Sequence, residues 1–360
     1  MAQTRSIKSV AERLRFGALR KVALALFSLG LFIFALILLK EGAAQLGPLV
    51  RNLLRINNPA NALGFGWLFA SVVMSGSPVA TITLTLLDVG ALTNTEAFAM
   101  ITGSRLGASF IVLFIGFIYA FRGGERKSSL STGLLSLLVT QTTYLPAFIL
   151  GILLLRTGWM DGLQMTRAAQ ITSLFDRIFD PVIHWMLLFL PRWLIFGLGF
   201  GVLMVSFALL DKALPEIHLE NSAFSGMARI LYRPVVTFTL GALVTLLTMS
   251  VSLSLSILVP LSMRGYIRRE NVIPYVMGAN ITTFIDTLIA AVLLANPSAF
   301  TVVMVNMLSV AVVSIVIILL VFRFYERTML GYSNQLLNKP KWLIVYMFGI
   351  FALPILLMFL

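Results

Sequence analysis

Long hydrophobic runs alternate with short polar segments along most of the chain. A run of about 20 apolar residues is long enough to cross a bilayer core of about 30 Å as an α-helix. We therefore expect an all-α polytopic membrane protein. Its predicted spans cover residues 22–39, 96–119, 130–155, 193–210, 273–295, 299–322 and 342–360.

Two further apolar segments, residues 60–89 and 235–261, are interrupted near the middle by small polar residues. The first contains Met74-Ser75-Gly76-Ser77, and the second contains Met249-Ser250-Val251-Ser252. Pro78 follows the first motif and has no N–H to donate, and Gly76 weakens a helix. Each segment is therefore predicted to form two half-helices joined by a broken tip.

Other special residues repeat in the same register. The shift that lays Met74 on Met249 also lays Pro59 on Pro234, Gly66 on Gly241, Gly90 on Gly265 and Gly103 on Gly278. A common register at so many positions indicates an internal duplication. In duplicated transporters the binding site lies between the copies, at interrupted membrane segments.

Basic residues dominate the charge of the chain. The net charge is +13, although 59% of the residues are hydrophobic and the mean hydropathy is +0.97. Because the basic residues cluster in short loops between spans, they set membrane orientation, and we expect no nucleic-acid partner. With the basic N-terminus in the cytoplasm, the basic loops at 122–127, 264–269 and 323–341 also lie inside, whereas Arg51 and Arg55 lie outside. The two copies then have opposite orientations.

The predicted fold is accordingly two inverted-topology repeats, each with a re-entrant, broken helical hairpin. We divide the chain into a basic amphipathic N-terminal segment (1–21), a first transport repeat (22–155), an interfacial linker (156–192), a second, inverted repeat (193–333) and a C-terminal transmembrane helix (334–360). The chain has no cysteine and only two histidines, His184 and His218. Disulfides and thiolate chemistry are thereby excluded, and no metal site is expected.

The broken tips are the first candidates for a binding site. A helix broken inside the membrane frees N–H and C=O groups, which is tolerated only beside protein or water. The N-terminus of a half-helix suits an anion, whereas freed carbonyls and hydroxyls suit sodium. The candidate substrate- or ion-binding hydroxyls are Ser75, Ser77, Thr81, Ser250, Ser252 and Ser254. The alternative is that these small residues only let helices pack closely.

Two charged residues, Arg105 and Asp286, lie deep within predicted spans. Such residues usually face the bundle interior and have a partner. Arg105 is either a fixed cation at the anion site, in place of one coupling sodium, or the partner of Asp286 in a structural ion pair. Asp286 is alternatively a protonatable coupling group. Asp88 and Glu96 lie at segment ends, where we expect them to be solvated.

Two further motifs follow the broken segments. The second copy reads Gly278-Ala279-Asn280-Ile281-Thr282-Thr283, and the first reads Gly103-Ser104-Arg105-Leu106-Gly107-Ala108-Ser109. With the duplicated tips, these motifs resemble those of the sodium/phosphate cotransporter family, across residues 30–321. In that family, each tip carries Gln-Ser-Ser-Ser and a Gly-Ala-Asn-Ile-Gly-Thr-Thr segment follows. The chain resembles a divergent member, because Met74 and Met249 stand at the Gln positions, Gly76 and Val251 at the middle serines, and Arg105 at an Asn. The resemblance implies roles for Asn280, Thr282 and Thr283 beside the second tip.

We therefore expect a secondary transporter that moves a small anion, most of all phosphate, by alternating access. The resemblance implies sodium coupling, with no cofactor other than that coupling ion. The alternatives are an ion-independent anion carrier or exporter, and a transport-dead scaffold or sensor of the same fold. No Ser-His pair or metal cluster points to an enzyme. We expect an integral protein of the bacterial cytoplasmic (inner) membrane, with its N-terminus in the cytoplasm. Its expected partners are the anion, membrane lipid and a second copy in a homodimer.

Overall fold

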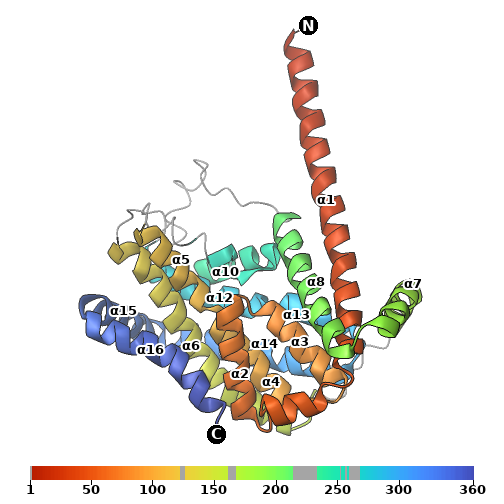
Figure 1. Cartoon of the computed structure of the whole chain (residues 1–360). Helices are drawn as coiled ribbons and strands as arrows, with labels where there is room; N and C mark the ends of the chain where they lie inside the picture. Colours follow the sequence, from red (N-terminus) through yellow and green to blue (C-terminus); the bar gives the residue numbers. More distant parts are fainter. Residues whose placement is uncertain are drawn as a thin grey trace.

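The structure is a computed structural model that describes residues 2–121, 126–160, 168–213, 233–251, 253–255, 258 and 268–360. All the regular structure in these ranges is helical (Figure 1). The elements of the first half are α1 (Ala2–Ala43), the π-helix η1 (Leu49–Leu53), α2 (Pro59–Val73), α3 (Ser77–Asp88), α4 (Asn94–Ala108), α5 (Phe110–Phe121), α6 (Arg126–Arg156) and α7 (Ala168–Phe189). Those of the second half are α8 (Arg192–Ala213), α10 (Pro234–Thr248), α12 (Arg269–Thr282), α13 (Phe284–Leu293), α14 (Pro297–Val316), the π-helix η2 (Ile317–Val321), α15 (Phe322–Asn338) and α16 (Pro340–Leu357).

Within the described ranges, seven helical stretches are long and apolar enough to cross a membrane, and several consist of consecutive elements. The protein is therefore an integral membrane protein with a helical bundle, as the hydrophobic pattern predicts. The stretches are Leu19–Ala43, Asn94–Phe121, Leu130–Arg156, Arg192–Ala213, Arg269–Leu293, Pro297–Asn338 and Pro340–Leu357. Two shorter apolar helices, α2 and α10, are those that end at the duplicated Met-Ser motifs.

Helices α2 and α4 pack in close contact and run parallel to each other. A side chain at Gly66 would collide with the carbonyl oxygen of Met100, and one at Gly103 would collide with that of Leu63. Gly107, one turn beyond Gly103, lies in the same way against the next turn of α2, at Trp67. The contacts thus advance in the same direction along both helices. Glycine is required here because the two backbones touch.

Helices α10 and α12 form a second pair with the same contacts, displaced along the chain by the shift that relates Met74 to Met249. Gly241 lies against the carbonyl oxygen of Tyr275, and Gly278 lies against that of Phe238. These four positions are those of Gly66, Met100, Gly103 and Leu63 in the other pair. Residues that the sequence shift relates therefore make the same contacts in the two helix pairs.

Both short helices end at the same conformation. Met74 follows α2 with φ 56° and ψ 26°, and Met249 follows α10 with φ 47° and ψ 17°. A left-handed backbone at a residue other than glycine costs about 1–2 kcal/mol, so it stops a helix and recurs only where the surroundings impose it. The predicted interruption at each Met-Ser motif is confirmed.

Helix α3 runs back along the first pair. Its start lies beside the end of α4, since Gly76 is next to Ser104 and Ala108. Its end at Asp88 is joined to the start of α4 by a short connection. Helices α2, α3 and α4 therefore run in one direction, back, and forward again.

Helices α1 and α8 lie side by side and antiparallel (Figure 1). Gly42 contacts Phe196, Gly199 contacts Leu39, and the Ser206 hydroxyl donates to the carbonyl of Ser28 at 2.8 Å. Rising residue numbers in α1 thus meet falling numbers in α8. Phe32 and Phe207, which are related by the shift that lays Met74 on Met249, meet edge to face at a centroid distance of 5.4 Å.

Candidate functional site

The two interrupted segments meet at one small cavity of about 30 Å³. Each tip lies beside the end of the helix that its own short helix packs against, which is α4 for the first tip and α12 for the second. Tyr144 of α6 adds an aromatic ring. The cavity is lined by Ser75, Gly76, Ser77, Arg105, Ala108, Ser109, Tyr144, Ser250, Val251, Asn280 and Thr283.

Among the described residues that line the cavity, Arg105 is the only ionised side chain, and it is 6% exposed. Its Nη1 donates to the hydroxyls of Ser77 and Thr283, both at 3.3 Å. Its Nη2 points the other way, donating to the Thr287 hydroxyl and lying 3.4 Å from Oδ1 of Asp286. The guanidinium carbon lies 4.9 Å from the ring centre of Phe284, a cation–π distance. The guanidinium therefore joins the cavity to Asp286.

Asn280 of α12 is related to Arg105 of α4 by the shift that lays Met74 on Met249. Its Nδ2 donates to the Thr140 hydroxyl at 3.1 Å, and its backbone carbonyl accepts from the Tyr144 hydroxyl at 2.9 Å. Tyr144 is completely buried. Helix α6 thus holds the second side of the cavity through two hydrogen bonds, both to the one residue Asn280.

The Arg105–Asp286 pair is incompletely bonded. Nε of Arg105 and Oδ2 of Asp286 are buried and have no hydrogen-bond partner among the described residues. Oδ1 of Asp286 accepts from the hydroxyl of the adjacent Thr287 at 2.8 Å as well as from Arg105. Buried polar atoms without partners are rare in proteins, so each one needs an explanation.

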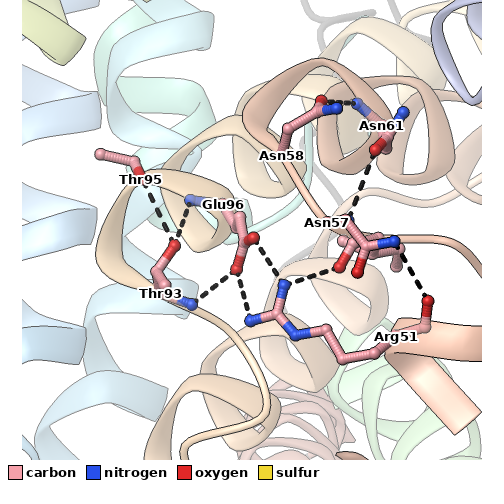
Figure 2. Close-up of polar contacts among 8 residues, drawn as sticks. Arg51, Asn57, Asn58, Asn61, Thr93, Thr95 and Glu96 are labelled. Carbon is pink, nitrogen blue, oxygen red and sulfur yellow. Dashed lines mark hydrogen bonds and ion pairs between the residues drawn. The ribbon is translucent and has the colours of Figure 1, made fainter. Parts of the chain in front are cut away.

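A second ion pair, Arg51–Glu96, contributes no residue to the cavity lining and is bonded through both carboxylate oxygens (Figure 2). Arg51 of η1 contacts both carboxylate oxygens of Glu96, at 2.6 Å and 2.9 Å, and also donates to the carbonyl of Ile56. Glu96 in turn accepts from the backbone N–H of Thr93 in a capping box at the start of α4. The hydrogen bond to Glu96 raises the pKa of Arg51. Our expectation of a solvated Glu96 is wrong, since only 4% of this residue is exposed.

Asp88 is likewise engaged. It pairs with Lys40 of α1 at 2.9 Å and accepts from Asn296, the N-cap of α14, at 2.8 Å. Its side chain is 9% exposed, so the expectation of solvation is wrong here too. These two carboxylates fasten the start of α4 and the end of α3.

Six of the residues singled out from the sequence line the cavity, namely Ser75, Ser77, Arg105, Ser250, Asn280 and Thr283. Three others do not. The hydroxyl of Thr81 donates to the carbonyl of Ser77, that of Thr282 donates to Ala242, and Ser254 bonds with Thr245 and Tyr275. Asp286 lies behind Arg105, and Ser252 lies outside the described residues.

Sequence reasoning missed Tyr144, Ser109 and Thr287. Ser109 is the one that the sequence could have indicated, because it lies in the repeated motif that also contains Arg105. Tyr144 and Thr287 carry no comparable signal, since their contacts join helices far apart in the chain.

Two larger hollows lie at the edges of the bundle. One of about 440 Å³ lies between α6, α15 and α16, and one of about 880 Å³ lies between the loop after α1 and the α7–α8 connection. The first is almost entirely apolar. Neither contains any part of the two tips, and in the described ranges no group of three or more His, Asp or Glu side chains could hold a metal ion. The small central cavity is therefore the candidate site.

The fold and the site define an integral membrane protein whose helices enclose a small polar cavity between two similarly packed helix pairs. Comparison with known proteins identifies no family, because no family model, no curated protein and no solved structure matches the chain.

Proposed function

We propose that the protein is a secondary transporter of a small inorganic anion, phosphate first among the candidates, which works by alternating access between two inverted repeats. The observation that carries the proposal is the shared cavity, where both interrupted tips meet at Arg105 and Asn280. Binding sites of duplicated transporters lie between the copies, at such interruptions.

The direction of the helices supports inverted copies. Helices α1 and α8 occupy corresponding places before the two short helices, and they run antiparallel. Phe32 and Phe207 are counterparts in the register of the duplication and contact each other. A residue that meets its own counterpart lies on the axis that relates the copies. We place the N-terminus in the cytoplasm, following the basic loops.

The length and direction of α2 and α3 support a re-entrant hairpin. Helix α2 has 15 residues and α3 has 12. At 1.5 Å per residue they extend about 22 Å and about 18 Å, short of the bilayer core of about 30 Å. Since α3 runs back beside α4, the chain leaves on the side where it entered. The matching tip after α10 supports the same arrangement in the second copy.

The chemistry of the cavity supports an anion. Helix α3 begins at Ser77, so its unpaired N–H groups and partial positive charge lie beside the cavity. The Arg105 guanidinium adds a full positive charge, and serine and threonine hydroxyls add donors. A cavity of about 30 Å³ can hold water but is small for phosphate, so the tips must separate to admit an oxyanion. That separation is the movement which alternating access requires.

Uptake of labelled phosphate into proteoliposomes, with and without a sodium gradient, tests the proposal. We expect uptake by the wild type and its loss in Arg105→Gln, because the anion then lacks its cation. Ser254→Ala is the matched control, since Ser254 is buried outside the cavity, and we expect it to keep uptake. Both variants must elute from size exclusion as the wild type does.

A folded wild type that takes up no phosphate in either condition would contradict phosphate as the substrate. If Arg105→Gln transported as well as Ser254→Ala, the assignment of this cavity as the anion site would fail. Sodium is the coupling ion that the resemblance implies, and uptake that is equal with and without its gradient would contradict that coupling.

A further inference from the structure

The two ends of the Arg105 guanidinium serve different neighbours. Nη1 lies against Ser77 and Thr283, which line the cavity. Nη2 lies against Asp286 and Thr287, which do not. A small rotation of this one side chain therefore changes how its positive charge is shared between the cavity and the carboxylate.

The molecule contains a reference for a purely structural ion pair. Arg51 and Glu96 contact through both carboxylate oxygens at 2.6 Å and 2.9 Å, with further backbone partners (Figure 2). Arg105 and Asp286 make one contact at 3.4 Å and leave Nε and Oδ2 without partners among the described residues, although both residues are more deeply buried than Arg51. Bidentate contacts make an Arg–carboxylate pair strong, and the Arg105–Asp286 pair lacks them. The looseness of this pair leaves Arg105 able to turn to another anion.

Binding of an anion by Arg105 changes the charge balance around Asp286. With the cavity empty, Arg105 and Asp286 neutralise each other. When an anion takes the guanidinium, the Asp286 carboxylate remains buried with only the Thr287 hydroxyl and N–H as donors among the described residues. An unpaired buried carboxylate is strongly unfavourable, and such a group is neutralised by taking up a proton.

We propose that Asp286 binds one proton each time the anion takes Arg105, so that the protein moves a proton together with each anion. This inference rests on the proposed transport function and names the proton as its coupling ion, in place of the sodium that the resemblance implies. The proton comes from water on the side to which the cavity is open and forms an O–H bond at Oδ2 of Asp286. On the opposite side the anion leaves, Arg105 returns to Asp286, and that O–H bond breaks to release the proton to water.

Few other ionisable groups in the described ranges act on Asp286. Asp211 of α8 and Tyr144 of α6 interact with it electrostatically, and Arg105 is its ion-pair partner. Helix α14, which packs on α13, has no ionisable residue. The nearby helices α3, α7 and α12 also carry ionisable residues. These are Asp88, paired with Lys40, the exposed residues Arg177, Asp180 and His184, and Arg269, Glu270 and the buried Tyr275 of α12.

The test uses the full chain in sodium-free proteoliposomes and measures two rates. The first is accumulation of labelled phosphate driven by a pH gradient, acidic outside, with the membrane potential clamped. The second is exchange of labelled external phosphate for unlabelled internal phosphate, which needs no net proton movement. We expect the wild type to perform both.

Asp286→Asn is the decisive variant because asparagine resembles the protonated acid but releases no proton. Arg105 then has no partner once the anion leaves, so the empty carrier cannot return. We expect exchange to continue and pH-driven accumulation to be lost. Asp88→Asn is the matched control, since it also removes a carboxylate from an ion pair but lies outside the cavity, and it should keep both activities.

Phosphate itself binds protons, so pH-driven accumulation by the wild type alone does not show that Asp286 carries the proton. The Asp286→Asn variant tests that point. Accumulation by Asp286→Asn at the wild-type rate would overturn the inference and leave the transport function intact. So would a wild type that accumulates phosphate only with a sodium gradient. Absence of exchange and accumulation under every gradient would instead overturn the transport function. If Asp286→Asn does not fold, Asp286→Glu replaces it as the test, because glutamate can still bind and release a proton. Failure of the folded glutamate variant to accumulate phosphate in response to the pH gradient would overturn the inference.

Discussion

The α2–α4 and α10–α12 pairs have the same backbone packing but different polar surroundings. Both place glycines against carbonyl oxygens at equivalent positions, and both short helices end at a left-handed methionine. Two ion pairs surround the first helix pair: Arg51–Glu96 joins η1 to the start of α4, and Lys40–Asp88 joins α1 to the end of α3. In the second copy, the four corresponding positions carry uncharged residues, namely Gly226, Asn271, Pro215 and Met263.

This difference separates what the fold requires from what one copy adds. The close helix contact and the tip conformation recur because they build the cavity from both sides. The ion pairs join positions that are charged in one copy alone, so they are not needed to form a tip. They hold the start of α4 to η1 and the end of α3 to α1. If the protein works as proposed, we expect the tip after α10, which lacks such charges, to make the larger movement when the cavity opens.

The largest loss of stability is expected at the glycines that make equivalent contacts in the two helix pairs. Gly103→Ala and Gly278→Ala each place a methyl group against a backbone carbonyl that cannot turn aside. We expect each to lower the free energy of unfolding by about 3 kcal/mol, as overpacking does in a tight core. Thermal unfolding of the purified protein in detergent measures the change. Gly201→Ala is the control, because no atom lies near that position. Tolerance of either of the first two would show that the pairs are not equivalent.

An intermediate effect should distinguish the pairs. Glu96→Ala leaves Arg51 without its partner and removes the capping box of α4. Loss of one partner of a fully buried pair costs about 3–5 kcal/mol, and because Arg51 is partly exposed we expect about 2 kcal/mol. Asn271→Ala, at the corresponding position, should cost about 1 kcal/mol at most. Equal losses of stability for Glu96→Ala and Asn271→Ala in the same unfolding assay would show that the ion pair does not distinguish the two helix pairs.

The smallest expected effect is a gain in stability from one substitution at each tip. Met74→Gly and Met249→Gly relieve the left-handed strain at the two tips. We expect each to stabilise the protein by up to about 1 kcal/mol, reduced by the side-chain contacts that methionine loses. Gly is destabilising elsewhere in a helix, so Leu240→Gly within α10 is the comparison. A loss of stability at either tip would mean that the methionine side chain matters more than its backbone.

Much of the fold is readable from the sequence because its signals are local or periodic. Apolar runs predict the spans, and the shared register predicts the two interruptions and marks the glycines that make the close helix contacts. The tip hydroxyls are only partly predictable. Thr81 and Thr282 bond to helix carbonyls instead, because a buried hydroxyl donates to whichever acceptor is near.

The remainder depends on contacts between distant segments. Glu96 is expected to be solvated because it begins a helix, yet η1 brings Arg51 against it. Nothing near Tyr144 in the sequence indicates that its hydroxyl reaches the backbone of Asn280. The pairing of Arg105 with Asp286 is one of two alternatives that the sequence leaves open, and the structure shows the pair while also placing Arg105 in the cavity wall.

The edge-to-face contact of Phe32 with Phe207 bears on how freely equivalent positions in the chain can vary. In an assembly of two separate, identical halves, both rings would belong to the same position, and each subunit would present one phenylalanine to the other. A single substitution would then have altered both sides of the joint at once. In one polypeptide the equivalent positions are encoded separately, so they can carry different residues, as Arg105 and Asn280 do.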